Sequence, residues 1–453
     1  MRETAERFAT CVAKAKSAEM SAICARRERE VSSSRRSFKG LCAWHIMSGS
    51  EESFNHELLM KPTIDSYIRL ALLAAACGVG QTLPIFAADG PEPATGGPVS
   101  GEAAIKGGEA PDPKILVPPQ PKKADPQMQA VLDQLASMGG QPITELSAKE
   151  ARKQPSPADA VKELMKKQGL KPEKLGKIDN VDIKLSSGKV DGRIYKPEGN
   201  GPFPVILYIH GGGWVLADLD TYDASPRALC KATNALVIST DYRHAPEHKF
   251  PAAHEDVFGA YQWTLENAGR WGGDASRVAV VGESAGGNMA VSLSMMAQAK
   301  GMQMPVHQVL VYPVASTSMA TESYGQNAQA VPLNAAMMKW FFEQTLAKEE
   351  DGNNHEINLL GAKTLAGLPP TTIITADIDP LRSDGELLAQ KLRTDGVPVE
   401  IKNYEGVTHE FFGMGAVVDT SREAVNFAAG KLKMAFGSDR TASTKAVQPD
   451  ESE

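Results

Sequence analysis

Ser284 lies at the centre of the pentapeptide Gly-Glu-Ser-Ala-Gly, residues 282–286. This pentapeptide alone is common by chance, but here a strand-like run, 277–281, precedes it and a helical pattern begins at Gly287. Glycines two residues before and after the serine permit a tight strand-to-helix turn in which larger side chains would clash. The pattern predicts that Ser284 is a nucleophile for acyl transfer.

A serine hydroxyl is a weak nucleophile at neutral pH, so a base must take its proton and a third group must hold the base. We predict that His409 is this base and that Asp379 orients it. Each follows a predicted strand, near Val399 and Thr372, on the side of the sheet where the nucleophile turn lies. The order serine, aspartate, histidine along the chain is one of the known triad orders.

Other acidic groups and imidazoles compete for these two roles. Asp377 is the main alternative to Asp379, and Asp384 is a second. Within the predicted domain, four histidines precede the serine, which is the wrong order, and two more occupy less suitable positions; in chain order the six are His210, His244, His248, His254, His307 and His355.

The segment His-Gly-Gly-Gly-Trp, residues 210–214, follows a predicted strand at 205–209. Three glycines let a loop fold back so that its N–H groups converge on the oxyanion of a tetrahedral intermediate. We predict an oxyanion hole made by Gly211, Gly212 and the N–H of Ala285; a simple glycine hinge is the alternative.

These residues require a scaffold that brings strand ends together. Short β-rich runs alternate with helical stretches from about residue 180 onward. The strands are expected at 205–209, 235–239, 278–281, 309–312, 372–375 and 399–402, and the helices at 256–266, 287–299, 385–394 and 422–436. Nearly continuous apolar strands separated by helices predict an α/β fold, with a mostly parallel central sheet covered by helices on both faces.

Helical patterns also precede the sheet, at 128–138 and from Ala158 onward. They predict a helical cap at the amino-terminal end of the domain. A further helical stretch, 334–346, interrupts the strand–helix alternation and would belong to the cap. The apolar cluster at 337–342 fits either the entrance to the site or core packing.

The most apolar stretch, 70–88, follows Met60, Lys61 and Arg69 and ends in small residues. This order is typical of a secretory signal peptide. Glycine and proline interrupt the run, which argues against a spanning helix. We expect a cleaved signal at 60–88 and an exported protein, periplasmic or secreted; an uncleaved anchor and a lipid-modified Cys77 are the alternatives.

The remaining boundaries follow from composition. Residues 1–59 have no periodicity and are interpreted as a non-native or disordered extension, with translation starting at Met60; a genuine regulatory extension is the alternative. Residues 89–124 are rich in Pro, Gly and Ala and read as a linker. The hydrolytic domain with its cap helices is placed at 125–436, and a disordered tail at 437–453.

Composition excludes several classes of function. A net charge of −7 without a basic stripe argues against a nucleic-acid partner. Of the five cysteines only Cys230 lies in the predicted domain, so neither a disulfide framework nor a zinc site with Cys/His spacing is predicted. No metal and no cofactor are expected, and no stable membrane span after processing.

From about residue 126 to 436 the chain resembles the hormone-sensitive-lipase-like branch of α/β-hydrolases, which includes bacterial esterases and lipases. Beyond the two glycine motifs, the matching segments are Asp-Tyr-Arg-His-Ala-Pro-Glu at 241–247, Phe-Pro-Ala-Ala at 250–253, Gly-Leu-Pro-Pro at 367–370 and Asp-Pro-Leu-Arg at 379–382. The resemblance implies a serine triad, an oxyanion hole and an amino-terminal helical cap. The chain departs from the family pattern at His244, Glu283 and Ser383, none of them in the triad.

Together these features predict a serine carboxylesterase that acts through an acyl-enzyme on Ser284. The resemblance implies short- to medium-chain acyl esters as substrates, with Trp214 as a substrate-binding residue at the entrance and His210 as a residue that positions the loop. An amidase or formamidase, or a lipase, could use the same triad. A binding module that kept the fold and lost the chemistry is a rival of another class. The expected partner is a small acyl ester, and a homodimer is left open.

Overall fold

The computed structural model describes residues 122–437. Eight strands form one sheet in the order β1-β2-β4-β3-β5-β6-β7-β8. Their bounds are β1 Lys177–Leu185, β2 Gly188–Lys196, β3 Phe203–Ile209, β4 Leu236–Thr240, β5 Gly273–Glu283, β6 Gln308–Val311, β7 Thr371–Ile378 and β8 Val399–Thr408. The strands from β4 to β8 run parallel, whereas β1 and β2 join antiparallel at one edge.

The predicted strands all occur, but the hairpin of β1 and β2 was not predicted. Its strands alternate exposed and buried positions and carry many charged residues. Every residue of β3 and β4, in contrast, is buried, as expected for strands covered on both faces. The sequence pattern therefore identified the inner strands and missed the solvated edge.

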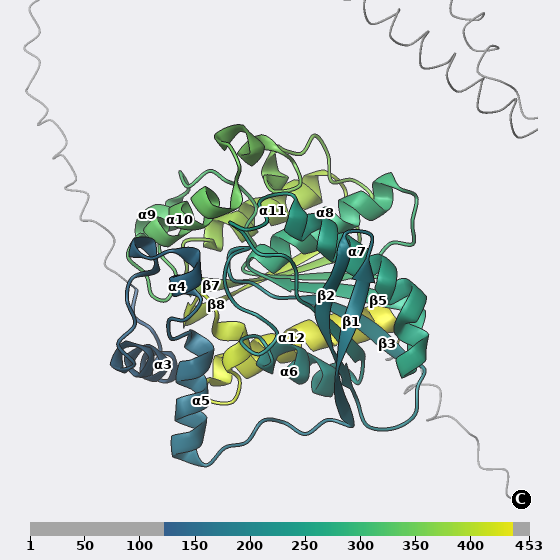
Figure 1. Cartoon of the computed structure of the whole chain (residues 1–453), viewed down its shortest axis with the longest axis horizontal. Coiled ribbons are helices and arrows are strands. Elements are labelled where there is room, and N and C mark those ends of the chain that lie inside the picture. Colours follow the sequence, from purple (N-terminus) through teal and green to yellow (C-terminus); the bar gives the residue numbers. More distant parts are fainter. Residues whose placement is uncertain (1–121, 438–453) are drawn as a thin grey trace, which may run out of the picture. The chain divides into compact units, whose positions relative to one another are not determined.

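Helices cover both faces of the sheet. The longer ones are α3 Pro126–Ser137, α5 Pro157–Gln168, α6 Ala224–Thr233, α7 Ala252–Asn267, α8 Ala285–Ala299, α10 Ala335–Thr345, α11 Arg382–Thr394 and α12 Asp419–Phe436, with short helices α4 Ala148–Ala151 and α9 Glu322–Gln326. Figure 1 shows α6 and α12 on one side of the strands and α8 and α11 on the other. The predicted helices are confirmed, each within a few residues, and only α6 among the longer ones was missed.

The core divides into two layers because side chains alternate along each strand. In β3, Val205 and Leu207 pack into the cluster that contains α7, α8 and α11, whereas Ile206 and Tyr208 pack with α6 and α12. All four side chains are fully buried. The mostly parallel α/β sheet expected from the sequence is thus the fold that the chain adopts.

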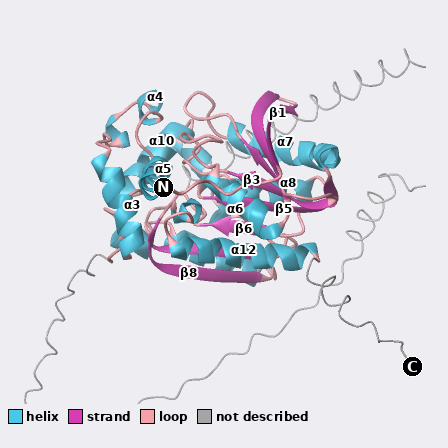
Figure 2. Ribbon diagram, turned by 90° about the horizontal axis from the view of Figure 1, so that it is seen from below, coloured by secondary structure: helices cyan, strands magenta, loops and turns pink. Residues whose placement is uncertain are grey.

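The amino-terminal helices α3 and α5 pack against one another at one end of the sheet (Figure 2). Local sequence explains where α5 begins and ends. Ser156 accepts from the backbone N–H of Asp159, whose carboxylate accepts from the N–H of Ser156, and Gly169 ends the helix with φ +68°. Both helices contribute buried side chains to the core, so the predicted cap is part of the domain.

The remaining boundary predictions fall mainly outside the described residues. The extension 1–59 and the signal segment 60–88 lie wholly outside them, as do most of the linker 89–124 and of the tail 437–453. Within 122–437, no helix is long and apolar enough to cross a membrane.

Candidate active site

Ser284 occupies the turn between β5 and α8. Its backbone has φ +56° and ψ −118°, a conformation that non-glycine residues rarely adopt. A Cβ atom at Gly282 would lie 2.1 Å from the carbonyl oxygen of Gly286, and one at Gly286 would lie 2.1 Å from that of Ile209. Both glycines are therefore needed for the turn to close against β3, and the turn holds the hydroxyl at the carboxyl end of the sheet.

The three residues predicted to form the triad meet at the carboxyl end of the sheet. Ser284 Oγ lies 3.0 Å from His409 Nε2, and His409 Nδ1 lies 2.7 Å from Asp379 Oδ2. Asp379 follows β7 and His409 follows β8, two neighbouring parallel strands. Since a carboxylate only accepts, Nδ1 carries the proton facing Asp379, which leaves Nε2 to accept from the serine hydroxyl.

The competing aspartates have other partners. Asp377 pairs with Arg382 at 3.2 Å and also contacts the Lys122 ammonium. Asp384 accepts from the N–H groups of Ala315 and Ser316. Of these three aspartates, only Asp379 hydrogen-bonds to His409.

Two opposing effects set the pKa of His409. Burial disfavours the charged imidazolium and lowers the pKa, but the negative charge and hydrogen bond of Asp379, together with the charges of Glu410 and Glu283, favour the imidazolium more strongly. The net pKa of His409 lies above its ordinary value of 6.5. His409 is thus a stronger base than a free imidazole.

Two side-chain hydrogen bonds fix the backbone of the predicted oxyanion loop. The Gly211 carbonyl oxygen accepts from Tyr242 Oη at 2.8 Å and from His210 Nδ1 at 2.9 Å. Because N–H and C=O point in opposite directions across a trans peptide, these bonds aim the N–H of Gly212 the other way. Gly212 has φ +91°, and a Cβ there would lie 2.1 Å from the Leu216 carbonyl oxygen. His210 therefore positions the loop, as the resemblance implied.

A cavity of about 1370 Å³ opens onto Ser284 and His409. Gly212 and Gly213 line it, whereas Gly211 and Ala285 are not among its described lining residues. Ala285 is nevertheless the first residue of α8, where backbone N–H groups lack partners within the helix. Gly213 was not among the predicted oxyanion residues, but it lines the cavity together with Gly212.

The cap supplies much of the remaining cavity wall. Side chains from α3, α5 and α10 line it, among them Leu135, Met165, Met337, Met338 and Phe341. The cluster 337–342 thus serves both roles that the sequence left open, because some members line the entrance to the site and others pack in the core. Its members Trp340 and Phe342 are buried in the core and do not line the cavity.

The prediction that Trp214 binds substrate is not supported by its position. Its side chain is 1% exposed and is not among the described residues that line the cavity. With φ +62° at Trp214, the indole stacks on His254 and packs against Phe342. A tryptophan after a glycine loop can serve packing as readily as binding, and here it belongs to the core.

An unpredicted polar cluster lies directly beneath the nucleophile. Glu283 is fully buried and accepts hydrogen bonds from Tyr208 and Tyr312. Burial raises the pKa of Glu283 to about 7, although these hydrogen bonds oppose the rise. The Tyr312 ring also lies 4.3 Å from that of His409, centroid to centroid, so this cluster supports the base.

A second carboxylate, Glu410, follows His409 directly. The Tyr222 hydroxyl contacts both of its carboxylate oxygens, at 2.7 and 2.8 Å. A Cβ on Gly211 would lie 2.3 Å from this same hydroxyl, so Tyr222 also packs against the oxyanion loop. Tyr222 and Glu410 both line the cavity. Neither was predicted from the sequence, because no motif marks them.

Comparisons with known proteins agree with this geometry. Residues 206–413 match a family model described as alpha/beta hydrolase fold. Esterase LipI of Mycobacterium tuberculosis is 38% identical over 257 residues, 54% of this chain and 79% of LipI. Carboxylic ester hydrolase LipN of the same organism is also 38% identical, over 52% of this chain and 65% of LipN, somewhat less than two thirds of that relative.

A solved structure is also similar to this chain. The hyperthermophilic esterase of the archaeon Pyrobaculum calidifontis superposes with a TM-score of 0.64 at 34% sequence identity, covering 69% of this chain and 99% of that one. The cap helices and the sheet thus belong to an arrangement found in a solved esterase.

Proposed function

The chain belongs to the hormone-sensitive-lipase-like family of α/β-hydrolases, and we propose that it hydrolyses carboxylic esters through an acyl-enzyme on Ser284. The observation that carries this proposal is the continuous hydrogen-bonded path from Ser284 Oγ through His409 to Asp379. Ester hydrolysis is also the activity named for LipN, LipI and the Pyrobaculum enzyme.

In the first step Ser284 Oγ attacks the ester carbonyl carbon while His409 Nε2 takes the hydroxyl proton. The carbonyl oxygen becomes an oxyanion, which the N–H groups of Gly212 and Ala285 are positioned to bind, with Gly211 the third donor expected from the motif. Asp379 stabilises the imidazolium formed on His409. The intermediate collapses, the ester C–O bond breaks, and the alcohol leaves with the proton from Nε2.

In the second step water replaces the alcohol. His409 Nε2 accepts a proton from the water molecule as its oxygen attacks the acyl carbon, and the same N–H groups bind the second oxyanion. The bond to Ser284 Oγ then breaks, the serine recovers its proton from His409, and the carboxylic acid is released. Each atom required is supplied by substrate, water and these side chains.

We propose short- to medium-chain acyl esters as substrates. The cavity reaches the nucleophile and has apolar walls from α3, α5 and α10, which suits an aliphatic acyl or alcohol group. Charged side chains, among them Arg152 and Asp218, line other parts of it. This mixed wall favours a small ester over a long lipid chain.

Export is a separate proposal that rests on the sequence of residues 60–88 alone. Amino-terminal sequencing of protein from the native host tests it. A mature start near Ala88 supports export with cleavage, whereas retention of residues before Met60 contradicts both the signal and the start site.

The proposed activity is tested by hydrolysis of p-nitrophenyl acetate, butyrate, octanoate and palmitate by wild type and Ser284→Ala, with p-nitroacetanilide as the amide. We expect turnover of the shorter esters that Ser284→Ala abolishes. Faster turnover of the anilide would favour an amidase, and highest turnover of palmitate a lipase. Equal rates for Ser284→Ala and wild type would refute the mechanism.

A further inference from the structure

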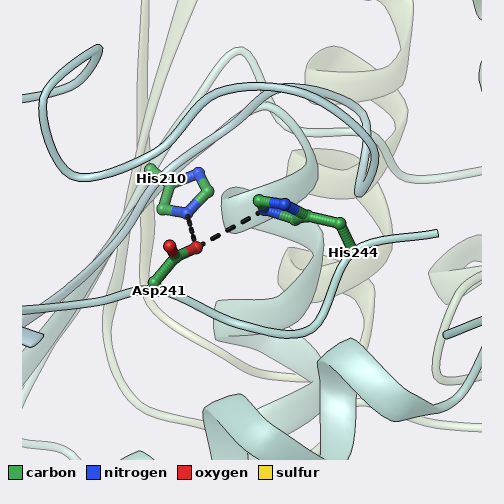
Figure 3. A group of neighbouring side chains, drawn as sticks. All are labelled: His210, Asp241 and His244. Carbon is green, nitrogen blue, oxygen red and sulfur yellow. Dashed lines mark hydrogen bonds and ion pairs between the residues drawn. The ribbon is translucent and has the colours of Figure 1, made fainter. Parts of the chain in front are cut away.

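Three potential metal ligands, His210, Asp241 and His244, lie together beside the oxyanion loop (Figure 3). His210 Nε2 is 3.1 Å from Asp241 Oδ1, and His244 Nε2 is 3.4 Å from the same oxygen. All three donor atoms lie within 4.8 Å of one another. His210 follows β3 and Asp241 follows β4, so adjacent parallel strands deliver two of the three ligands to one edge.

The hydrogen bonds around His210 leave a lone pair facing the carboxylate. The Gly211 carbonyl oxygen only accepts, so the proton of a neutral His210 ring is on Nδ1, 2.9 Å away. Nε2 then directs its lone pair at Asp241 Oδ1, which is itself an acceptor and already accepts from the N–H of Tyr242 at 2.9 Å. A positive charge between these atoms, either a second proton on His210 or a cation, resolves the conflict.

His244 distinguishes the two possibilities. A second proton on His210 would satisfy the His210–Asp241 pair and give His244 no role. Yet His244 Nε2 lies 3.4 Å from the same oxygen without the geometry of a hydrogen bond, and this buried atom has no hydrogen-bond partner among the described residues. A buried nitrogen without a partner is costly unless something binds it.

We propose that His210, Asp241 and His244 bind a first-row divalent cation, with Zn²⁺ the best match. Two imidazoles and one carboxylate are a common zinc ligand set with one position left open. Zinc bonds of about 2.0 to 2.1 Å in a tetrahedron separate neighbouring ligand atoms by about 3.3 Å. The two separations from Asp241 Oδ1, 3.1 and 3.4 Å, bracket that value.

Access and charge also suit a cation. Asp241 and His244 line the large cavity, so an ion can enter from it. Arg152, whose positive charge acts on His244, forms two hydrogen bonds to Glu247, and the charge of Glu247 offsets it. Asp218 adds a second carboxylate, near enough for the charge of Asp241 to act on it. A bound ion would fix His210, and through it the loop that carries Gly212.

The test is metal binding by the purified full-length protein after removal of metals with a chelator. Co²⁺ is titrated and its visible d–d absorption recorded, Zn²⁺ affinity is measured against a chromogenic chelator, and thermal unfolding is followed with and without Zn²⁺. Wild type is compared with His244→Gln and with His248→Gln, an exposed histidine four residues later as matched control.

We expect wild type and His248→Gln to bind the ion equally and to melt at a higher temperature with Zn²⁺. His244→Gln should bind at least about tenfold more weakly, because one of three ligands is lost, and should lose the shift in melting temperature. Equal affinity of the two variants would overturn the proposal. If His244→Gln does not fold, the wild-type spectrum decides: thiolate charge-transfer bands, or no d–d absorption at stoichiometric Co²⁺, would also overturn it.

Discussion

Asp379 Oδ2 and His409 Nδ1 lie 2.7 Å apart, and both side chains are almost completely buried. The other carboxylate oxygen of Asp379 accepts from the N–H of Leu381 at 2.8 Å, which fixes the orientation of the carboxylate. Asp377, only two residues earlier, is paired with Arg382 instead. Strand β7 ends between the two aspartates. Asp377 therefore lies within the strand, whereas Asp379 lies just beyond its end, where it reaches the histidine.

Replacement of Asp379 by asparagine should lower kcat by about a thousand- to ten-thousandfold, because the amide no longer stabilises the imidazolium or enforces the tautomer. Asp377→Asn is the matched control and should retain kcat near the wild-type value. Steady-state hydrolysis of p-nitrophenyl butyrate by both variants, after a check of folding by circular dichroism, measures the difference. A larger loss in Asp377→Asn would exchange the roles of the two aspartates.

Activity should increase with pH through the pKa of His409. The imidazole must be neutral to accept the serine proton, so the protonated form below the pKa is inactive. Since Asp379, together with the charges of Glu410 and Glu283, more than offsets the effect of burial, the inflection of kcat/KM should lie above 6.5, and the residual activity of Asp379→Asn should inflect at a lower pH. A wild-type inflection below 6.5 would contradict this electrostatic account.

Gly212→Ala should reduce kcat by about a hundredfold or more, the cost typical of losing an oxyanion donor. The added methyl group would overlap the Leu216 carbonyl oxygen and force the peptide to move. Gly269→Ala, which meets nothing within 4 Å, is the control and should not change kcat. Full activity of a folded Gly212→Ala would remove Gly212 from the proposed oxyanion hole.

The stability of Glu283→Gln relative to wild type should increase with pH. Burial raises the pKa of Glu283 from 4.5 to about 7, so the folded protein holds a proton that the unfolded chain releases between these values. This contribution to stability is complete below pH 4.5 and is lost as pH rises through 7. Glutamine stays neutral and loses nothing, so the difference in unfolding free energy between variant and wild type should shift in favour of the variant from pH 5 to pH 8. Urea unfolding at both pH values measures it, and a constant difference would show that Glu283 does not titrate there.

The nucleophile, its base and its carboxylate could be predicted because each follows a buried strand in a recognisable local pattern. The turn glycines also carried a clear signal, since backbone crowding restricts those positions. The direction of the side chain after the glycine loop could not be predicted in this way. Trp214 packs into the core because His254 and Phe342 provide packing partners that no local pattern reveals.

Contacts between segments distant in sequence were equally hidden. Sequence spacing predicted no metal ligands, because His210 lies more than thirty residues from His244 and only the pairing of β3 with β4 brings them together. The buried cluster around Glu283 draws Tyr208 and Tyr312 from strands β3 and β6, or just beyond their ends. Such clusters are products of sheet topology and cannot be read from any one segment.

The mechanism requires that Ser284 forms the covalent intermediate. Wild type, Ser284→Ala and the control Ser292→Ala are mixed with p-nitrophenyl acetate, quenched in acid within the first turnover, and digested for peptide mass spectrometry. The mechanism predicts one acetyl group on the peptide containing Ser284 in wild type and Ser292→Ala, and none in Ser284→Ala. Acetylation of another residue that persists in Ser284→Ala, together with undiminished hydrolysis, would contradict it.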